Sequence, residues 1–212
     1  MTHLCAVKSR FALKPLFLKD PPRLILASTS VYRRQLLERL QWPFDSVPPQ
    51  VPEERLDGES PRQLVERLAQ WKAESVSARF PAALVIGSDQ LAVRGDEVLG
   101  KPGTIENCQD QLRTSAGRDL TFLTAVHVVD GRSQHHDAHV DRTIVRFRAL
   151  TDIEIARYVE RDRPLDCAGG FKAEALGIAL FDRIESVDPT ALTGLPLVWL
   201  AGALRRCGLP IP

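Results

Sequence analysis

The alternation of apolar and polar positions divides the chain into short strands and amphipathic helices. The apolar run 24–27 meets a polar break at Ser28, which predicts a short buried strand. A helix is expected directly afterwards, because Ser30 is a good N-cap residue and a leucine stripe follows over 36–40. This helix should end before Pro43, so the first predicted unit is a strand, a polar corner and a helix.

Three later positions carry clear helix-start signals. Ser60 precedes Pro61, which suits the first helical position because proline has no amide hydrogen to lose there. Thr104 opens a second apolar stripe, and Thr151 with Glu154 has the spacing of a capping box. A final helix is expected to reach about residue 207.

The strands alternate with these helices. The patterns predict strands or hairpin partners over 83–93 (interrupted by the polar GSDQ at 87–90), 98–102, 120–131, 139–150 and 178–184, with a polar loop at 131–138. Helices alternating with strands that also form hairpins indicate an α/β fold with a mixed sheet flanked by helices.

Composition narrows the class of protein. With 212 residues, 44% hydrophobic and 26% charged, the chain is typical of a soluble globular protein. A net charge of +1 argues against nucleic-acid binding, and no apolar run reaches the roughly 18 residues that span a bilayer. Four cysteines without a CxxC pair disfavour a zinc ribbon or disulfide scaffold and fit a reducing cytoplasm. Residues 1–22 are expected to be a poorly ordered extension, with an organelle-targeting segment as the lesser alternative, and 23–212 a single domain.

The corner between the first strand and helix is a candidate anion site. A helix N-terminus presents unpaired N–H groups and the positive end of the helix dipole. Ser28 and Ser30 add hydroxyl groups there, and Arg33 adds a guanidinium suited to phosphate oxygens. An ordinary capped helix with a solvated arginine pair remains the alternative.

Asp89 is the candidate acid. It follows the apolar residues Val85 and Ile86, at a place where α/β folds often carry their active sites. Such a carboxylate needs a partner or a metal, so Asp89 is a candidate general base or Mg²⁺ ligand. A turn-forming aspartate beside Gly87 is the alternative.

Two glycine-containing stretches carry further charges. Lys101, in GKP, offers a compact positive charge for phosphate, although a solvated turn lysine is the commoner case. In CAGGFKAEALG, the adjacent Gly169 and Gly170 permit close backbone approach before Lys172 and Glu174. In an extended segment the last two would share a face, while a flexible loop with unremarkable charges is equally compatible.

Two further motifs give only weak signals. The histidines of HHDAH, at 135, 136 and 139, lie in the predicted hairpin loop and at its end without carboxylate or cysteine partners, which disfavours a structural zinc site. RGD at 94–96 is most simply a turn.

Taken together and in order, LILASTSVYRRQLLERL, VIGSDQ, GKP and CAGGFKAEALGI…DPTALTGLPL resemble the motifs of the Maf family of nucleotide pyrophosphatases, over about residues 23–206. Tyr32, Gln90 and the GFKxE form of the late motif are most similar to the 7-methyl-GTP pyrophosphatase branch. One departure is Val31, where the family usually has proline. The resemblance implies an elongated fold related to inosine triphosphate pyrophosphatases, with a cleft between two lobes, a divalent cation (Mg²⁺ or Mn²⁺) and often a homodimer.

The resemblance also implies roles for individual positions. Asp89 matches the catalytic proton acceptor, and Glu53 matches an acidic residue near the metal, so these two are the expected metal ligands. The remaining positions are basic residues near the phosphates (Arg33, Lys72, Lys101, Lys172) and residues that set base specificity (Tyr32, Gln90, Glu174).

The expected reaction is therefore hydrolysis of 7-methyl-GTP to 7-methyl-GMP and pyrophosphate, clearing modified nucleotides. Two alternatives stay open: the same chemistry on UTP, dTTP or modified pyrimidine nucleotides, and a non-catalytic nucleotide-binding regulator of cell division. A regulator would be stabilised by nucleotide without hydrolysing it.

Overall fold

The computed structural model describes residues 21–95 and 97–212. The predicted N-terminal extension, apart from Pro21 and Pro22, lies outside the described residues. Within the described part, no helix combines the length and the apolar character that crossing a membrane requires.

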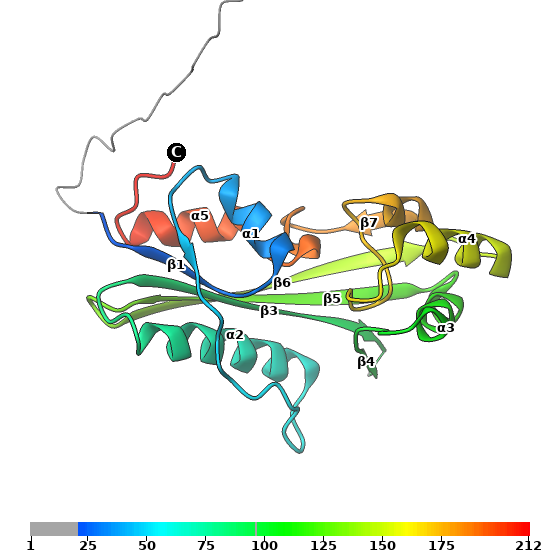
Figure 1. Cartoon of the computed structure of the whole chain (residues 1–212), viewed down its shortest axis with the longest axis horizontal. Coiled ribbons are helices and arrows are strands. Elements are labelled where there is room, and N and C mark those ends of the chain that lie inside the picture. Colours follow the sequence, from blue (N-terminus) through cyan, green and yellow to red (C-terminus); the bar gives the residue numbers. More distant parts are fainter. Residues whose placement is uncertain (1–20, 96) are drawn as a thin grey trace, which may run out of the picture.

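A mixed sheet of seven strands forms the centre of the protein, as predicted. Its order is β2-β1-β3-β5-β6-β7, with β4 paired to β3; β1 runs parallel to β2 and β3, and the other pairs are antiparallel. The strands are β1 (Leu24–Ala27), β2 (Asp45–Ser46), β3 (Leu84–Arg94), β4 (Glu97–Leu99), β5 (Asp119–Asp130), β6 (His135–Phe147) and β7 (Phe181–Glu185). The three long strands β3, β5 and β6 give the molecule its elongated shape (Figure 1).

The helices begin where the sequence predicts. Ser60 and Thr151 form complete capping boxes, and Ser30 and Thr104 each accept a hydrogen bond from a first-turn amide. The α-helices are α1 (Val31–Glu38), α2 (Pro61–Ser77), α3 (Ile105–Ser115), α4 (Asp152–Asp162) and α5 (Leu197–Arg206), with short 3₁₀ turns η1 (Leu176–Leu180) and η2 (Ala191–Thr193).

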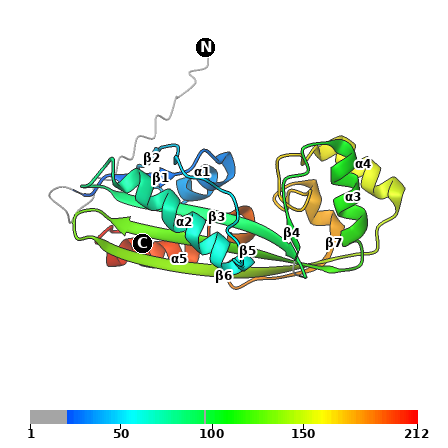
Figure 2. The same ribbon diagram turned by 90° about the horizontal axis from the view of Figure 1, so that it is seen from below.

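The helices cover the sheet unevenly. At one end α2 lies on one face while α1 and α5 lie on the opposite face; α3 and α4 gather at the other end with β4 and β7 (Figures 1 and 2). Separate apolar clusters match this arrangement: one joins Leu36 and Leu200 to the sheet, and another joins Leu112 and Ile155 at the far end. The molecule therefore has two helical groups connected by long shared strands.

Three local predictions were wrong. The polar GSDQ does not interrupt its strand, because β3 runs continuously through 87–90 and pairs with β5 along that length. The segment 178–184 begins in the 3₁₀ turn η1 and becomes a strand only at Phe181. His135 and His136 belong to β6 and not to the predicted loop, since the hairpin turn is confined to residues 131–134.

Candidate active site

Helix α2 packs closely against β3, and this packing brings together the first two charged groups of the site, Lys72 and Asp89. A Cβ atom at Gly87 would lie 2.5 Å from the backbone nitrogen of Ala73 and 2.9 Å from its Cβ. Only glycine therefore lets the helix approach this strand so closely. One turn of α2 carries Lys72, and β3 carries Asp89 two residues beyond Gly87, on the same face of the strand.

A buried lysine joins two carboxylates. The Lys72 ammonium donates to Asp89 Oδ1 at 2.6 Å and lies 2.7 Å from Glu53 Oε1. Lys72 and Asp89 are both buried, while the Glu53 side chain is 64% exposed. The hydrogen bond and charge of Lys72 lower the pKa of Glu53 despite partial desolvation. Glu53 and Asp89, the predicted metal ligands, therefore converge on one point.

Two further cations lie near these carboxylates, Arg33 near both and Lys101 near Glu53. Desolvation lowers the pKa of Arg33, while the charges of Asp89 and Glu53 act in the opposite direction. Lys101 is exposed, and its charge adds to the lowering of the Glu53 pKa. The structure thus brings these charged residues from four separate segments into one region, while their roles stay predictions.

The first turn of α1 supplies amide groups beside Arg33. Ser28 Oγ accepts from the Ser30 amide at 3.1 Å, and Ser30 Oγ accepts from the Arg33 amide at 3.4 Å. The two predicted phosphate-binding hydroxyls are thus engaged in shaping the corner. The amides of Val31 and Tyr32 stand at positions where a helix has no internal acceptor, and no other acceptor for them occurs among the described residues.

The loop 188–196 closes the site from the other side of the sheet. The Gly194 carbonyl accepts from Arg33 Nε and from Ser88 Oγ, both at 3.0 Å. Gly194 adopts φ +115°, a conformation that glycine takes without the penalty of a Cβ atom. The loop therefore fixes the direction of the guanidinium beside Asp89.

Asp188 organises this loop, a role that the sequence analysis did not assign. Its buried carboxylate accepts from the Thr190 amide at 2.9 Å and from the Val198 amide at 2.7 Å. Thr190 Oγ1 in turn donates to the Leu195 carbonyl and accepts from the Leu197 amide. The motif DPTALTGLP contains these residues, and an aspartate before proline just upstream of a helix is the available signal.

Gln90 is held more tightly than its predicted role in base recognition suggests. Its Nε2 lies within 3.0 Å of Thr124 Oγ1 and of the carbonyls of Ala191 and Leu192. Two N–H bonds serve these three acceptors, so the amide has no donor left for a ligand. Its Oε1 has no hydrogen-bond partner within residues 21–95 and 97–212, and only this acceptor remains for recognition.

Tyr32 meets the late glycine-containing stretch. Its hydroxyl lies 3.9 Å from Cys167 Sγ, and burial followed by the charges of Cys167, Asp166 and Glu174 raises its pKa. Tyr32 and Glu174, both predicted specificity residues, are therefore near each other, and the tyrosine is a neutral phenol at physiological pH.

Lys172 is tied to the second helical group. Its Nζ donates to the Asp162 carbonyl at 3.1 Å, at the end of α4. The segment after Lys172 turns instead of extending, so of the two alternatives left open by the sequence, a shared face of an extended segment does not apply. Its position beside phosphate stays a prediction.

The donor set suits a hard divalent cation. Mg²⁺ is commonly held by one or two carboxylates and keeps several waters. Asp89 Oδ1 and Glu53 Oε1 face Lys72, and the second oxygen of each carboxylate has no hydrogen-bond partner in the described part of the chain. The residues therefore fit such an ion without displacing Lys72.

Comparison with known proteins shows the family of this chain. The family described as Maf-like protein matches residues 23–207. The chain belongs to the Maf family. It is 56% identical to a 7-methyl-GTP pyrophosphatase of Xanthomonas axonopodis pv. citri, over 90% of this chain and 100% of that protein. It is also 50% identical to a protein of that name from Aromatoleum aromaticum, over 90% of this chain and 98% of the relative.

Two solved structures of Ham1 proteins are distantly similar to this Maf protein. A Ham1 protein from Coxiella burnetii is 13% identical with a TM-score of 0.47, covering 88% of this chain and all of that one. The Staphylococcus aureus Ham1 protein is 14% identical with a TM-score of 0.43, covering 59% and 71% of the two chains.

Proposed function

We propose that this protein hydrolyses 7-methyl-GTP to 7-methyl-GMP and pyrophosphate. The observation that carries the proposal is the set of cations around two carboxylates: buried Lys72 holds Asp89 and contacts Glu53, Arg33 lies near both acids, and Lys101 lies near Glu53. The names of its relatives at 50–56% identity support the choice of substrate.

Different charged residues serve substrate binding and the reaction. The triphosphate tail docks against the free amides of α1, with Arg33 and Lys101 offsetting its negative charge. Asp89 orients and deprotonates the water that attacks the α-phosphorus. Lys72 holds the Asp89 carboxylate in place and offsets its charge in a buried position, which makes it a positioning residue as much as a phosphate ligand.

We further propose that Glu53 and Asp89 hold a divalent cation, Mg²⁺ or Mn²⁺. A bound cation supplies positive charge to the polyphosphate and to the pyrophosphate that leaves. Lys72 keeps the two carboxylates together whether or not the ion is bound, because it contacts one oxygen of each.

Base selection rests on Tyr32 and Glu174. Methylation at N7 gives guanine a delocalised positive charge, and stacking on the Tyr32 ring provides a cation–π contact of about 1–2 kcal/mol when desolvated. Glu174 accepts from the guanine N1–H and N2 amine while complementing the charge. Gln90 adds only its carbonyl oxygen, because its amide donors are already used.

A substrate panel tests the proposal directly. Pyrophosphate release is measured for 7-methyl-GTP, GTP, UTP and dTTP, each with Mg²⁺, Mn²⁺ or chelator. The expected result is preferred turnover of 7-methyl-GTP that depends on the metal and is lost in Asp89→Asn. Full activity of Asp89→Asn would end the assigned role of this acid.

The same panel distinguishes the alternatives. Preference for UTP or dTTP would assign the pyrimidine substrates. Thermal stabilisation by nucleotide without pyrophosphate release would assign the regulator. Tyr32→Arg should reduce the preference for 7-methyl-GTP over UTP, and an unchanged ratio would refute the cation–π account.

A further inference from the structure

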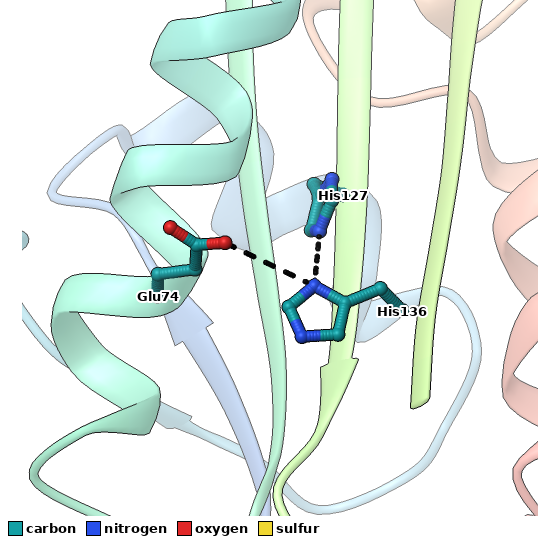
Figure 3. Close-up of side chains that lie close together, drawn as sticks. All are labelled: Glu74, His127 and His136. Atoms are coloured by element: carbon teal, nitrogen blue, oxygen red, sulfur yellow. Dashed lines mark hydrogen bonds and ion pairs between the residues drawn. The ribbon is translucent and has the colours of Figure 1, made fainter. Parts of the chain in front are cut away.

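A second group of potential ligands lies where α2 crosses β5 and β6. Glu74 of α2, His127 of β5 and His136 of β6 place three ligand atoms within 4.8 Å of one another. Figure 3 shows one ring nitrogen of His136 facing both the His127 ring and the Glu74 carboxylate. No carboxylate partner for HHDAH is evident in the sequence, but the fold supplies Glu74 from a distant helix.

Distances within this group are close to those that a zinc-like ion requires. His127 Nε2 lies 3.0 Å from His136 Nδ1, and His136 Nδ1 lies 3.9 Å from Glu74 Oε1. Zn–N bonds of about 2.0–2.1 Å in a tetrahedral site separate neighbouring ligand atoms by about 3.3 Å. The observed distances bracket this value, so small side-chain rotations would bring the three atoms into ligating positions.

The surroundings also suit a metal. Gln70 Nε2 donates to Glu74 Oε1 at 2.8 Å, the kind of supporting hydrogen bond that orients a ligating carboxylate. His127 is buried and contributes to the lining of a surface hollow of about 520 Å³, whereas Glu74 is half-buried and His136 is exposed, so the group can be reached from solvent.

We propose that Glu74, His127 and His136 bind one divalent transition-metal ion of the Zn²⁺ class. Two imidazoles and one carboxylate favour such an ion over Mg²⁺ and leave one position for water. Binding uses the lone pairs of His127 Nε2 and His136 Nδ1, so the hydrogen they share moves to an outward ring nitrogen. The ion links α2, which carries Lys72, to β5 and β6. This site is separate from the proposed function, which does not depend on it.

The test uses the full chain without a histidine tag, titrated with Zn²⁺ at saturating Mg²⁺ in a calorimeter and in thermal unfolding. Wild type is expected to bind one more Zn²⁺ than His136→Ala and to gain thermal stability that the variant does not. His135→Ala is the matched control, because its side chain is exposed on the neighbouring position of β6 and points to the opposite face.

Glu74→Gln keeps the size of the side chain and removes its charge. It should weaken Zn²⁺ binding by at least about tenfold, because mutating even a residue that only hydrogen-bonds to a metal ligand lowers metal affinity by about 10–100-fold. Co²⁺ should give the strong visible absorption of a four-coordinate ion in wild type and lose it in His136→Ala. Equal Zn²⁺ binding by wild type and His136→Ala would overturn the site. Unchanged binding by Glu74→Gln would overturn the three-ligand assignment.

Discussion

Replacing Lys72 with methionine tests whether one buried cation holds the active site together. Methionine has a similar length but no charge, so Asp89 would lose its partner at 2.6 Å while its side chain stays only 11% exposed. At an effective dielectric of 20 the gross attraction over 2.6 Å is about 6 kcal/mol, most of which offsets desolvation.

Removing one partner of a buried ion pair typically lowers the free energy of unfolding by about 3–5 kcal/mol. We expect the lower part of that range for Lys72→Met, because the charge of Arg33 also acts on Asp89. The assay is equilibrium unfolding in urea, with the change read from the midpoint at constant slope. Lys101→Met is the matched control: its side chain is exposed and should change the unfolding free energy by less than about 0.5 kcal/mol.

The double variant Lys72→Met/Asp89→Asn separates the pair from its surroundings. Removing both charges leaves no unpaired ion from this pair, so the double variant should lose less stability than the two single losses added together. A coupling energy of about 0.5–3 kcal/mol is expected for groups in contact. Additive losses, or a cost below about 1 kcal/mol for Lys72→Met alone, would refute the view that this lysine supports Asp89.

Three further predictions concern the frame of the site. Gly87→Ala should cost about 1–3 kcal/mol in urea unfolding and lower pyrophosphatase activity, because the new Cβ pushes against the backbone of α2; unchanged values of both would contradict this. Asp188→Asn should reduce turnover of the substrate without moving Asp89, because the substitution weakens the hydrogen bonds that order the loop 188–196, and this loop directs Arg33. Wild-type kinetics of the variant would contradict the role of Asp188 in ordering this loop. The hydrogen bonds of Thr151 and Arg148 lower the pKa of Glu154 from 4.5 to about 2, so its contribution to stability is present above pH 4.5 and lost as the pH falls toward 2. Glu154→Gln should therefore reduce the slope of the unfolding free energy against pH in that window by up to one proton. An unchanged slope would contradict this.

Local signals in the sequence were sufficient for the helix starts. Ser30, Ser60, Thr104 and Thr151 cap helices as predicted, because a cap depends on residues only two or three positions away. The path of β3 was harder to predict. Its polar residues 87–90 look like an interruption, but pairing with β5 and contacts with α2 and the loop 188–196 satisfy them.

The sequence suggested which residues form the candidate site but only some of the contacts between them. Motif order placed Arg33, Asp89 and Lys101 in one site; in the structure Arg33 lies near Asp89 and Glu53, and Lys101 lies near Glu53. Motif order could not show that Lys72 lies between two carboxylates or that the Gln90 amide is occupied, because both depend on which side chains the fold brings from distant segments. The predicted homodimer and the metal stay predictions.

The position of α2 links the two sites that the structure suggests. Lys72 reaches Asp89 from one turn of this helix, and Glu74, two residues later, faces His136. Gly87 of β3 pairs directly with His127 of β5. Because Gly87 has no side chain, α2 can pack closely against the sheet at this point. A displacement of α2 would therefore disturb both groups together. A Zn²⁺ ion bound at Glu74, His127 and His136 should protect the Lys72–Asp89 pair against urea, so the midpoint of Gly87→Ala should rise with Zn²⁺ and the midpoint of Gly87→Ala/His136→Ala should not. Equal responses of the two variants would show that the helix is held independently of the metal.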